Sequence, residues 1–278
     1  LDVITDRDFA RNRTLYFCYS EPAATGSANS TAMARAVLST DLRQLEQVRV
    51  IFSQKPKFAS RLHFGCRIAQ AADGNLFLAL GDRFQRMADA ETLDNHHGKV
   101  VRVRPDGSVP GDNPFVKTAG ALPEIWSIGH RNPQGMVVVD GVLYAHEHGA
   151  RGGDELNRIE PGANHGWPPV TGGIDYTYAR ITPYQSLPDM TPPLVEWTPS
   201  IAPAGMAWYD SALFPQWRGS LLVAALKKRS VRRVPMVNGV PGPQELLFQE
   251  LGERIRDVRT GPDGAVYLLT DSPAGPVR

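Results

Sequence analysis

Short hydrophobic runs and turn-forming residues alternate along the whole chain. The apolar runs are four to six residues long and rich in Val, Leu, Phe and Tyr, and Gly, Pro, Asn and Asp separate them. This pattern predicts short β-strands joined by tight turns. Residues 32–48 give the best amphipathic helix pattern, although β-branched neighbours weaken it. We therefore expect an all-β protein with little helix.

One short pattern occurs three times, at residues 73–77, 140–144 and 263–267. Each copy is an Asp-Gly turn followed by a strand that contains an aromatic residue. The glycines of the first and second copies are 67 positions apart and those of the second and third are 123 apart, close to one and two blades of a propeller. Residues 205–209 are expected to be a fourth copy with a degraded turn. The repeats predict a β-propeller.

Composition and charge exclude several partners. With 42% hydrophobic and 21% charged residues over 278 positions, the chain can form one or two domains with a large core. The net charge of +1 gives no reason to expect a nucleic-acid partner. No apolar run approaches the ~20 residues that span a bilayer, so we expect no membrane insertion. Cys18 and Cys66 make no disulfide framework and are expected to be buried free thiols.

Three polar motifs stand at the ends of predicted strands, where a rigid scaffold presents reactive side chains. The first is residues 63–67, His-Phe-Gly-Cys-Arg, and the second is Gly-Asp at 81–82, which ends nineteen positions after His63. The third is residues 129–135, Gly-His-Arg-Asn-Pro-Gln-Gly. Imidazole suits proton transfer at neutral pH, and a guanidinium suits carboxylates and other anionic oxygens. The motifs therefore predict an active site.

With these motifs in this order, the sequence resembles the soluble dehydrogenases of aldose sugars that depend on pyrroloquinoline quinone (PQQ), the glucose/sorbosone dehydrogenase family of six-bladed β-propellers. Residues 8–13, 254–257 and 262–264 extend the resemblance over nearly the whole chain. The resemblance implies a single β-propeller domain over residues 1–278. Family members carry a further first blade before this point, so we expect a propeller that lacks much of its first blade.

The resemblance implies roles for the motif residues. His63 matches the general base that removes the hydroxyl proton, and Asp82 matches the residue that orients its imidazole. Arg131 and Asn132 match the pair that contacts the quinone oxygens and stabilises the charge developing on them. Apart from the resemblance, a histidine at such a place is more often structural. The other residues that match cofactor contacts are His148, Lys227, Arg254 and Arg256.

Two calcium ions are also implied by the resemblance. The backbone carbonyls of Gly149 and Ala150 match the ligands of a calcium ion bound to the quinone, with alanine in place of the usual proline. Glu155 and the backbone carbonyl of His165 match the ligands of a second, structural calcium. Histidine replaces the usual tyrosine there, and because only the carbonyl binds, we expect the site to persist.

Two further features of the sequence are ambiguous. His96 and His97 have no third ligand at a zinc-like spacing, and we expect them to lie in a solvated loop. Residues 168–203 are rich in Pro, Gly, Tyr and Thr. Their aromatic side chains suit a sugar-binding cleft and a loop packed against itself equally well.

The reaction implied by the resemblance is oxidation of an aldose at its C1 hydroxyl to the lactone, with hydride passing to the quinone. PQQ and calcium are the expected cofactors, an external acceptor takes the electrons, and the expected protein is a periplasmic or secreted monomer or homodimer. One alternative is a calcium-dependent propeller lactonase, which the cations Arg131, Lys227, Arg254 and Arg256 disfavour. The other is a non-catalytic sugar-binding propeller, which the presence of His63 and Arg131 disfavours.

Overall fold

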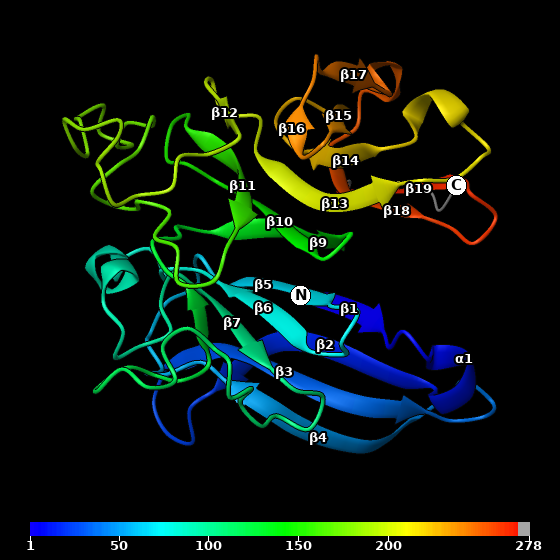
Figure 1. The fold of residues 1–278 in the computed structure, drawn as a ribbon, viewed down its shortest axis with the longest axis horizontal. Coiled ribbons are helices and arrows are strands. Elements are labelled where there is room, and N and C mark those ends of the chain that lie inside the picture. Colours follow the sequence, from blue (N-terminus) through cyan, green and yellow to red (C-terminus); the bar gives the residue numbers. More distant parts are fainter. Residues whose placement is uncertain (272–278) are drawn as a thin grey trace.

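The computed structural model describes residues 1–271, and the regular structure of these residues is almost entirely β (Figure 1). Their strands form five antiparallel sheets, each built from segments that are close together in the sequence. Four of these sheets have four or five strands, and the last is a two-stranded hairpin. In residues 1–271 we find no helix with the length and apolar character needed to cross a membrane.

The strands follow chain order within the sheets. The first sheet contains β1 (Asp2–Thr5), β2 (Thr14–Pro22), β3 (Asn29–Leu38) and β4 (Leu45–Ser53). The second contains β5 (Gly65–Gln70), β6 (Leu76–Leu80), β7 (Lys99–Val103) and β8 (Ile125–Ser127). The third contains β9 (Pro133–Val139), β10 (Val142–Glu147), β11 (Asp154–Ile159) and β12 (Val195–Trp197). The fourth contains β13 (Pro203–Tyr209), β14 (Ser220–Ala225), β15 (Ser230–Val237), β16 (Val240–Pro241) and β17 (Glu245–Leu247), and the fifth contains β18 (Ile255–Thr260) and β19 (Val266–Thr270). The helical segments are α1 (Phe9–Asn12) and the 3₁₀ turns Met87–Glu91, Pro215–Trp217 and Gln249–Leu251.

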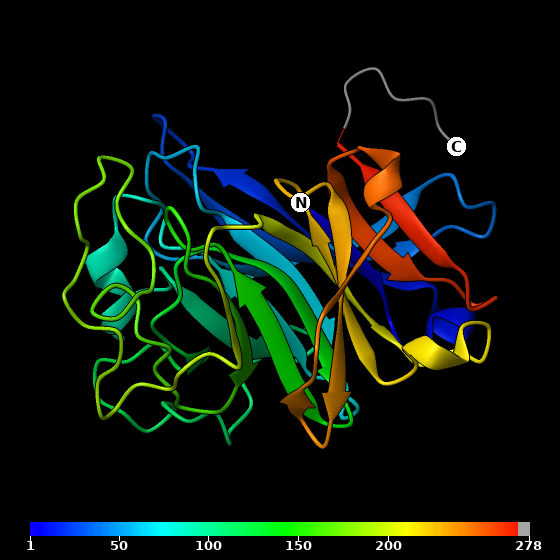
Figure 2. The same ribbon diagram turned by 90° about the horizontal axis from the view of Figure 1, so that it is seen from above.

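The arrangement of the sheets is that of a β-propeller, which confirms the predicted fold class. The first strands of the last four sheets, β5, β9, β13 and β18, pack side by side near the middle of the molecule, and each sheet extends outward from them (Figures 1 and 2). Neighbouring strands are antiparallel, so the loop before each first strand and the hairpin between each second and third strand lie at one end of the propeller. We call this the site end.

Strand alternation explains how the sheets pack on one another. Along β6, Leu76, Leu78 and Leu80 face the core between the first and second sheets. Phe77 and Ala79 face the core between the second and third sheets. All five side chains are buried, because both faces of this sheet are covered by a neighbouring blade.

The three predicted Asp-Gly turns are confirmed. Gly74, Gly141 and Gly264 have φ values of +88°, +80° and +79°, a conformation that glycine adopts without steric cost. Each lies in the connection between the first and second strand of its sheet. The expectation for residues 205–209 is wrong, because these residues form most of β13, a first strand, and the equivalent connection is residues 210–219.

The helix considered for residues 32–48 is also wrong. Residues 32–38 belong to β3, which pairs with β2 on one side and β4 on the other, and residues 45–48 begin β4. Ala32, Met33, Ala34 and Ala36 are fully buried between the sheets. Ladder pairing on both sides and burial on both faces therefore outweigh the helix propensity of this alanine-rich segment.

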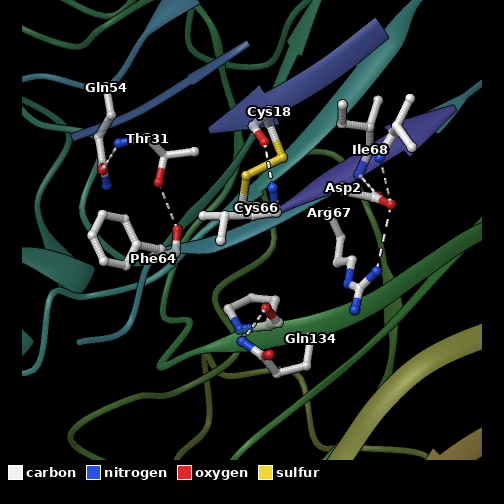
Figure 3. The surroundings of a disulfide bond; sticks show 12 residues. Asp2, Cys18, Thr31, Gln54, Phe64, Cys66, Arg67, Ile68 and Gln134 are labelled. Atoms are coloured by element: carbon white, nitrogen blue, oxygen red, sulfur yellow. Dashed lines mark hydrogen bonds and ion pairs between the residues drawn. A yellow bond between two sulfur atoms is a disulfide. The ribbon is translucent and has the colours of Figure 1, made fainter. Parts of the chain in front are cut away.

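The expectation of free thiols is wrong as well. Cys18 in β2 and Cys66 in β5 form a disulfide with a Cα–Cα distance of 5.9 Å (Figure 3). Both cysteines are buried in the core between the first and second sheets. The bond links two adjacent blades, and one of its cysteines, Cys66, lies three residues after His63 in the sequence.

Candidate active site

The site end of the propeller gathers the predicted residues from separate blades. The loops before β5, β9 and β18 carry His63, Arg131 and Arg254. The hairpins between second and third strands carry Asp82, His148 and Lys227. The propeller therefore brings residues that are up to 191 positions apart to one end of the molecule, as their places in the repeat require.

His63 and Asp82 form a buried pair. The His63 Nδ1 atom lies 2.6 Å from the Asp82 Oδ1 atom, and the two side chains are 11% and 0% exposed. The carboxylate oxygen accepts, so Nδ1 carries the proton and Nε2 has its lone pair free. Imidazole in this tautomer can accept a proton from a bound hydroxyl group.

Two glycines, Gly65 and Gly81, allow the segment that carries His63 to lie close against the segment that carries Asp82. A Cβ atom on Gly81 would lie 2.2 Å from the His63 carbonyl oxygen, and one on Gly65 would lie 2.7 Å from the Gly81 nitrogen. His63 itself has a φ of +48°. The glycines of the first and second motifs therefore place His63 against the residue that precedes Asp82.

Arg83 fixes the loop that carries His63. Its fully buried guanidinium donates to the carbonyl oxygens of Ser60 and Leu62, at 2.6 and 3.2 Å, and to the Asn29 side chain at 2.6 Å. It also stacks on the Phe64 ring, with 3.9 Å between the guanidinium carbon and the ring centroid. Arg83 directly follows the second motif, but its role could not be recognised from the sequence because its partners lie elsewhere in the chain.

Arg131 lies next to Asp82, whose backbone N–H donates to the Arg131 carbonyl oxygen at 2.9 Å. Its Nη1 atom donates to the carbonyl oxygens of His148 and Gly149, at 3.0 and 2.5 Å. The backbone N–H groups of Arg131 and Asn132 donate to the carboxylate of Glu147, at 2.5 and 3.2 Å. These bonds hold the turn of the third motif against the end of β10 and keep the guanidinium fixed in place.

A cavity of about 710 Å³ lies beside these residues. It is lined by His63, Asp82 and Arg131, and also by Ala150 and Tyr176. Its volume lies in the range of small-molecule sites. Four predicted site residues therefore line one cavity, and residues 168–183 form part of its wall, with Tyr176 as their one aromatic side chain there.

The other predicted cofactor contacts do not line this cavity. Arg254 and Arg256 both pair with Asp271, at 3.2 and 2.8 Å. Lys227 is exposed at the site end, and its backbone N–H donates to Ile201. The His148 Nε2 atom donates to the Pro203 carbonyl at 2.7 Å, and burial lowers the pKa of His148.

Two of the four residues predicted to bind calcium, Gly149 and Glu155, line a second cavity of about 10 Å³ together with Glu147 and Arg131. This volume suits one water or one ion. Ala150 lines the main cavity instead, and His165 lines neither of the two. Burial raises the pKa of both glutamates, and charge repulsion from Glu147 raises the pKa of Glu155 further. Carbonyl and carboxylate oxygens are the donors that calcium prefers. In this structure, however, the Gly149 carbonyl accepts from Arg131, and residues 1–271 contain no group of three or more His, Cys, Asp and Glu side chains arranged for a metal.

His96 and His97 are not in a solvated loop, so that expectation is wrong. Both are almost fully buried. The His97 Nδ1 atom lies 2.7 Å from the Asp89 carboxylate, and the His96 Nδ1 atom accepts from the Lys55 N–H at 3.0 Å. Asp89 belongs to the same connection as His97, whereas Lys55 comes from the loop between β4 and β5. Burial by a distant loop explains why the local sequence gave no sign of it.

The comparisons place the chain in a family. The sequence model described as "Glucose / Sorbosone dehydrogenase" matches residues 1–278. The aldose sugar dehydrogenase YliI of Escherichia coli K12 is 43% identical over 280 residues, which cover 99% of this chain and 75% of that protein. The crystal structure of the E. coli soluble aldose sugar dehydrogenase in its apo-form has a TM-score of 0.94 at 40% identity, covering 98% of this chain and 79% of that one. The PQQ-bound aldose sugar dehydrogenase of Streptomyces coelicolor has a TM-score of 0.78 at 25% identity, covering 100% and 76%.

Fold and site thus define a propeller of the sugar dehydrogenase class. The chain belongs to the glucose/sorbosone dehydrogenase family.

Proposed function

We propose that this protein is an oxidoreductase that oxidises aldose sugars at the C1 hydroxyl to the lactone, with PQQ and calcium as cofactors and residues 1–278 as a single propeller domain. The observation that carries the proposal is the His63–Asp82 pair, which lines one cavity together with Arg131. The PQQ-bound relative and the aldose sugar dehydrogenases in the family support the choice of cofactor and substrate.

The residues of this chain supply the proton transfer. The sugar hydroxyl donates to His63 Nε2, which takes the proton as the C1–H bond breaks. Asp82 keeps the proton on Nδ1 and stabilises the imidazolium that forms. The quinone, when bound, accepts the hydride that leaves C1. Arg131 places its positive charge at the cavity wall, where it stabilises negative charge on a bound anionic oxygen.

Other residues of the site end are proposed to hold the cofactors. Cations suit the carboxylates of the quinone, and carbonyl and carboxylate oxygens suit calcium. The proposed quinone contacts are Arg131, Asn132, His148, Lys227, Arg254 and Arg256. The proposed calcium ligands are the carbonyls of Gly149 and Ala150 for the cofactor ion, and Glu155 with the His165 carbonyl for the structural ion.

The disulfide supports a periplasmic or secreted location, since such bonds form and persist in oxidising compartments. We propose that an external acceptor reoxidises the quinone there, and that the protein acts as a monomer or homodimer.

Reconstitution tests the proposal. Protein purified without cofactor is mixed with PQQ and calcium, and the absorbance of the bound quinone is followed before and after an aldose is added. Bleaching on sugar addition is the expected result. His63→Ala is expected to bind PQQ normally and to lower turnover by roughly 10²- to 10⁴-fold, the usual contribution of a general base.

Three results would contradict the proposal. Collapse of PQQ affinity in His63→Ala would show that His63 binds the cofactor rather than acting as the base. Sugar binding with no quinone binding would favour the non-catalytic propeller. Hydrolysis of an added lactone in the absence of quinone would favour the lactonase.

A further inference from the structure

We propose that Trp167 is a positioning residue, which holds the Asp82 carboxylate and through it the His63 imidazole in the orientation that proton removal requires. The kinetic consequence rests on the proposed function. The hydrogen-bond chain itself belongs to the protein without ligands and can be tested there.

The indole of Trp167 completes the hydrogen bonding of Asp82. Its Nε1 atom donates to Asp82 Oδ2 at 2.8 Å. The other carboxylate oxygen, Oδ1, already has His63 Nδ1 at 2.6 Å and the Phe84 N–H at 2.7 Å. Within residues 1–271, Trp167 is the only donor to Oδ2. Because the Asp82 side chain is fully buried, loss of the indole N–H would leave a charged oxygen without a partner.

The position of Trp167 is fixed by the loop between β11 and β12. The Trp167 backbone N–H donates to the Gly129 carbonyl at 3.0 Å. Just before it, Gly166 has a φ of +94° and donates its N–H to the Asn164 side chain at 2.9 Å. This turn directs the indole, which is 8% exposed, toward a residue 85 positions away in another blade.

The same indole also contacts Arg131. The guanidinium carbon of Arg131 lies 5.2 Å from the Trp167 ring centroid, within the range of a cation–π interaction. Trp167 lines the main cavity together with His63, Asp82 and Arg131. One side chain therefore contacts both Asp82 of the proton-accepting pair and the Arg131 guanidinium.

Two substitutions separate the hydrogen bond from the bulk of the ring. Trp167→Phe keeps an aromatic ring and removes the N–H donor. Trp167→His removes the six-membered ring but retains an N–H at the corresponding position of the five-membered ring. Trp126→Phe is the matched control, because the Trp126 Nε1 atom is buried without a hydrogen-bond partner among the described residues and does not line the main cavity.

The first readout needs neither cofactor nor sugar. The proton between His63 Nδ1 and Asp82 gives a strongly downfield NMR resonance, identified by its loss in His63→Ala. We expect Trp167→Phe to shift or broaden this resonance, and Trp167→His and Trp126→Phe to retain it. A resonance unchanged in Trp167→Phe would overturn the proposal.

The second readout is turnover with PQQ, calcium and an aldose. Loss of a hydrogen bond to a charged group predicts a fall in kcat of roughly ten- to a hundredfold for Trp167→Phe, with KM within about twofold. Trp167→His is expected to recover most of kcat. If Trp167→His were the slower variant, ring packing rather than the N–H would be responsible, and the proposal would be wrong. If the variants keep and lose the NMR resonance as expected but the wild type does not oxidise sugars, the proposed function would be refuted and the hydrogen-bond chain would stand.

Discussion

Removal of the Cys18–Cys66 disulfide provides a quantitative test of how the first two blades are joined. The bond closes a loop across a sequence separation of 48 residues. The chain-entropy model gives about 4 kcal/mol of stabilisation for a loop of this length, because the cross-link restricts the unfolded chain. For a protein of this size, a change of that magnitude lowers the thermal midpoint by roughly 10 °C.

The double variant Cys18→Ala/Cys66→Ala is compared with the wild type in thermal unfolding, each with and without reductant. We expect the reduced wild type to unfold near the temperature of the double variant, and reductant to leave the double variant unchanged. Because the reduced wild type keeps both sulfur atoms, the effect of reductant on it measures the cross-link rather than the loss of packing in the core.

Thiol titration of the unfolded protein provides the independent control. Without reductant we expect no titratable thiol, and after reduction we expect both cysteines to react. Two reactive thiols before reduction would show that the cysteines are free, as their sequence context suggested. A midpoint that reductant moves by less than about one degree would contradict the loop-entropy estimate.

Three further outcomes test other parts of the structure. Gly205→Ala would place its Cβ atom 1.6 Å from the Asp257 Oδ1 atom, so we expect a loss of about 1–3 kcal/mol in urea unfolding, whereas Gly111→Ala, which faces open space, should have little effect. Burial alone would raise the pKa of Asp6, but its four hydrogen bonds outweigh burial and lower the pKa from 3.8 to about 2. Asp6 therefore stabilises the fold above its unfolded pKa, and the thermal midpoint should fall more steeply between pH 4 and pH 2 in the wild type than in Asp6→Asn. Chelation of calcium should lower the midpoint more in the wild type than in Glu155→Gln, which lacks a proposed ligand of the structural ion, and an equal effect in both would place that ion elsewhere.

The strands and their order could be predicted because they depend on local features. Side chains alternate along β6, so this strand contributes to the cores on both of its faces. The Asp-Gly turns at Gly74, Gly141 and Gly264 all lie between the first and second strands of their sheets. Residues 205–209 were misassigned because β13 is largely buried and has the same apolar composition as a second strand. Composition alone does not distinguish two strands that are both covered by neighbouring blades.

Contacts between blades could not be predicted in this way. Cys18 and Cys66 face one core from different sheets, and the His97 Nε2 atom contacts the Pro56 carbonyl, which belongs to the distant loop between β4 and β5. Nothing within the sequence around these residues indicates the partner. The resemblance to a family identified His63 and Asp82, and the structure places them in hydrogen-bond contact, while their catalytic roles stay predictions.

The repeat explains which site residues the sequence can indicate and which it cannot. His63, Asp82 and Arg131 occupy loops that every blade places at the site end, so the order of the motifs is enough to bring them together. Trp167 belongs instead to the long connection between β11 and β12, whose path is set by turns and by contacts with the loop before β9. The length and sequence of such a connection can vary among related proteins while the blades keep the same fold. The contact between Trp167 and Asp82 therefore ties the regular part of the propeller to its irregular part, and only the folded structure shows it.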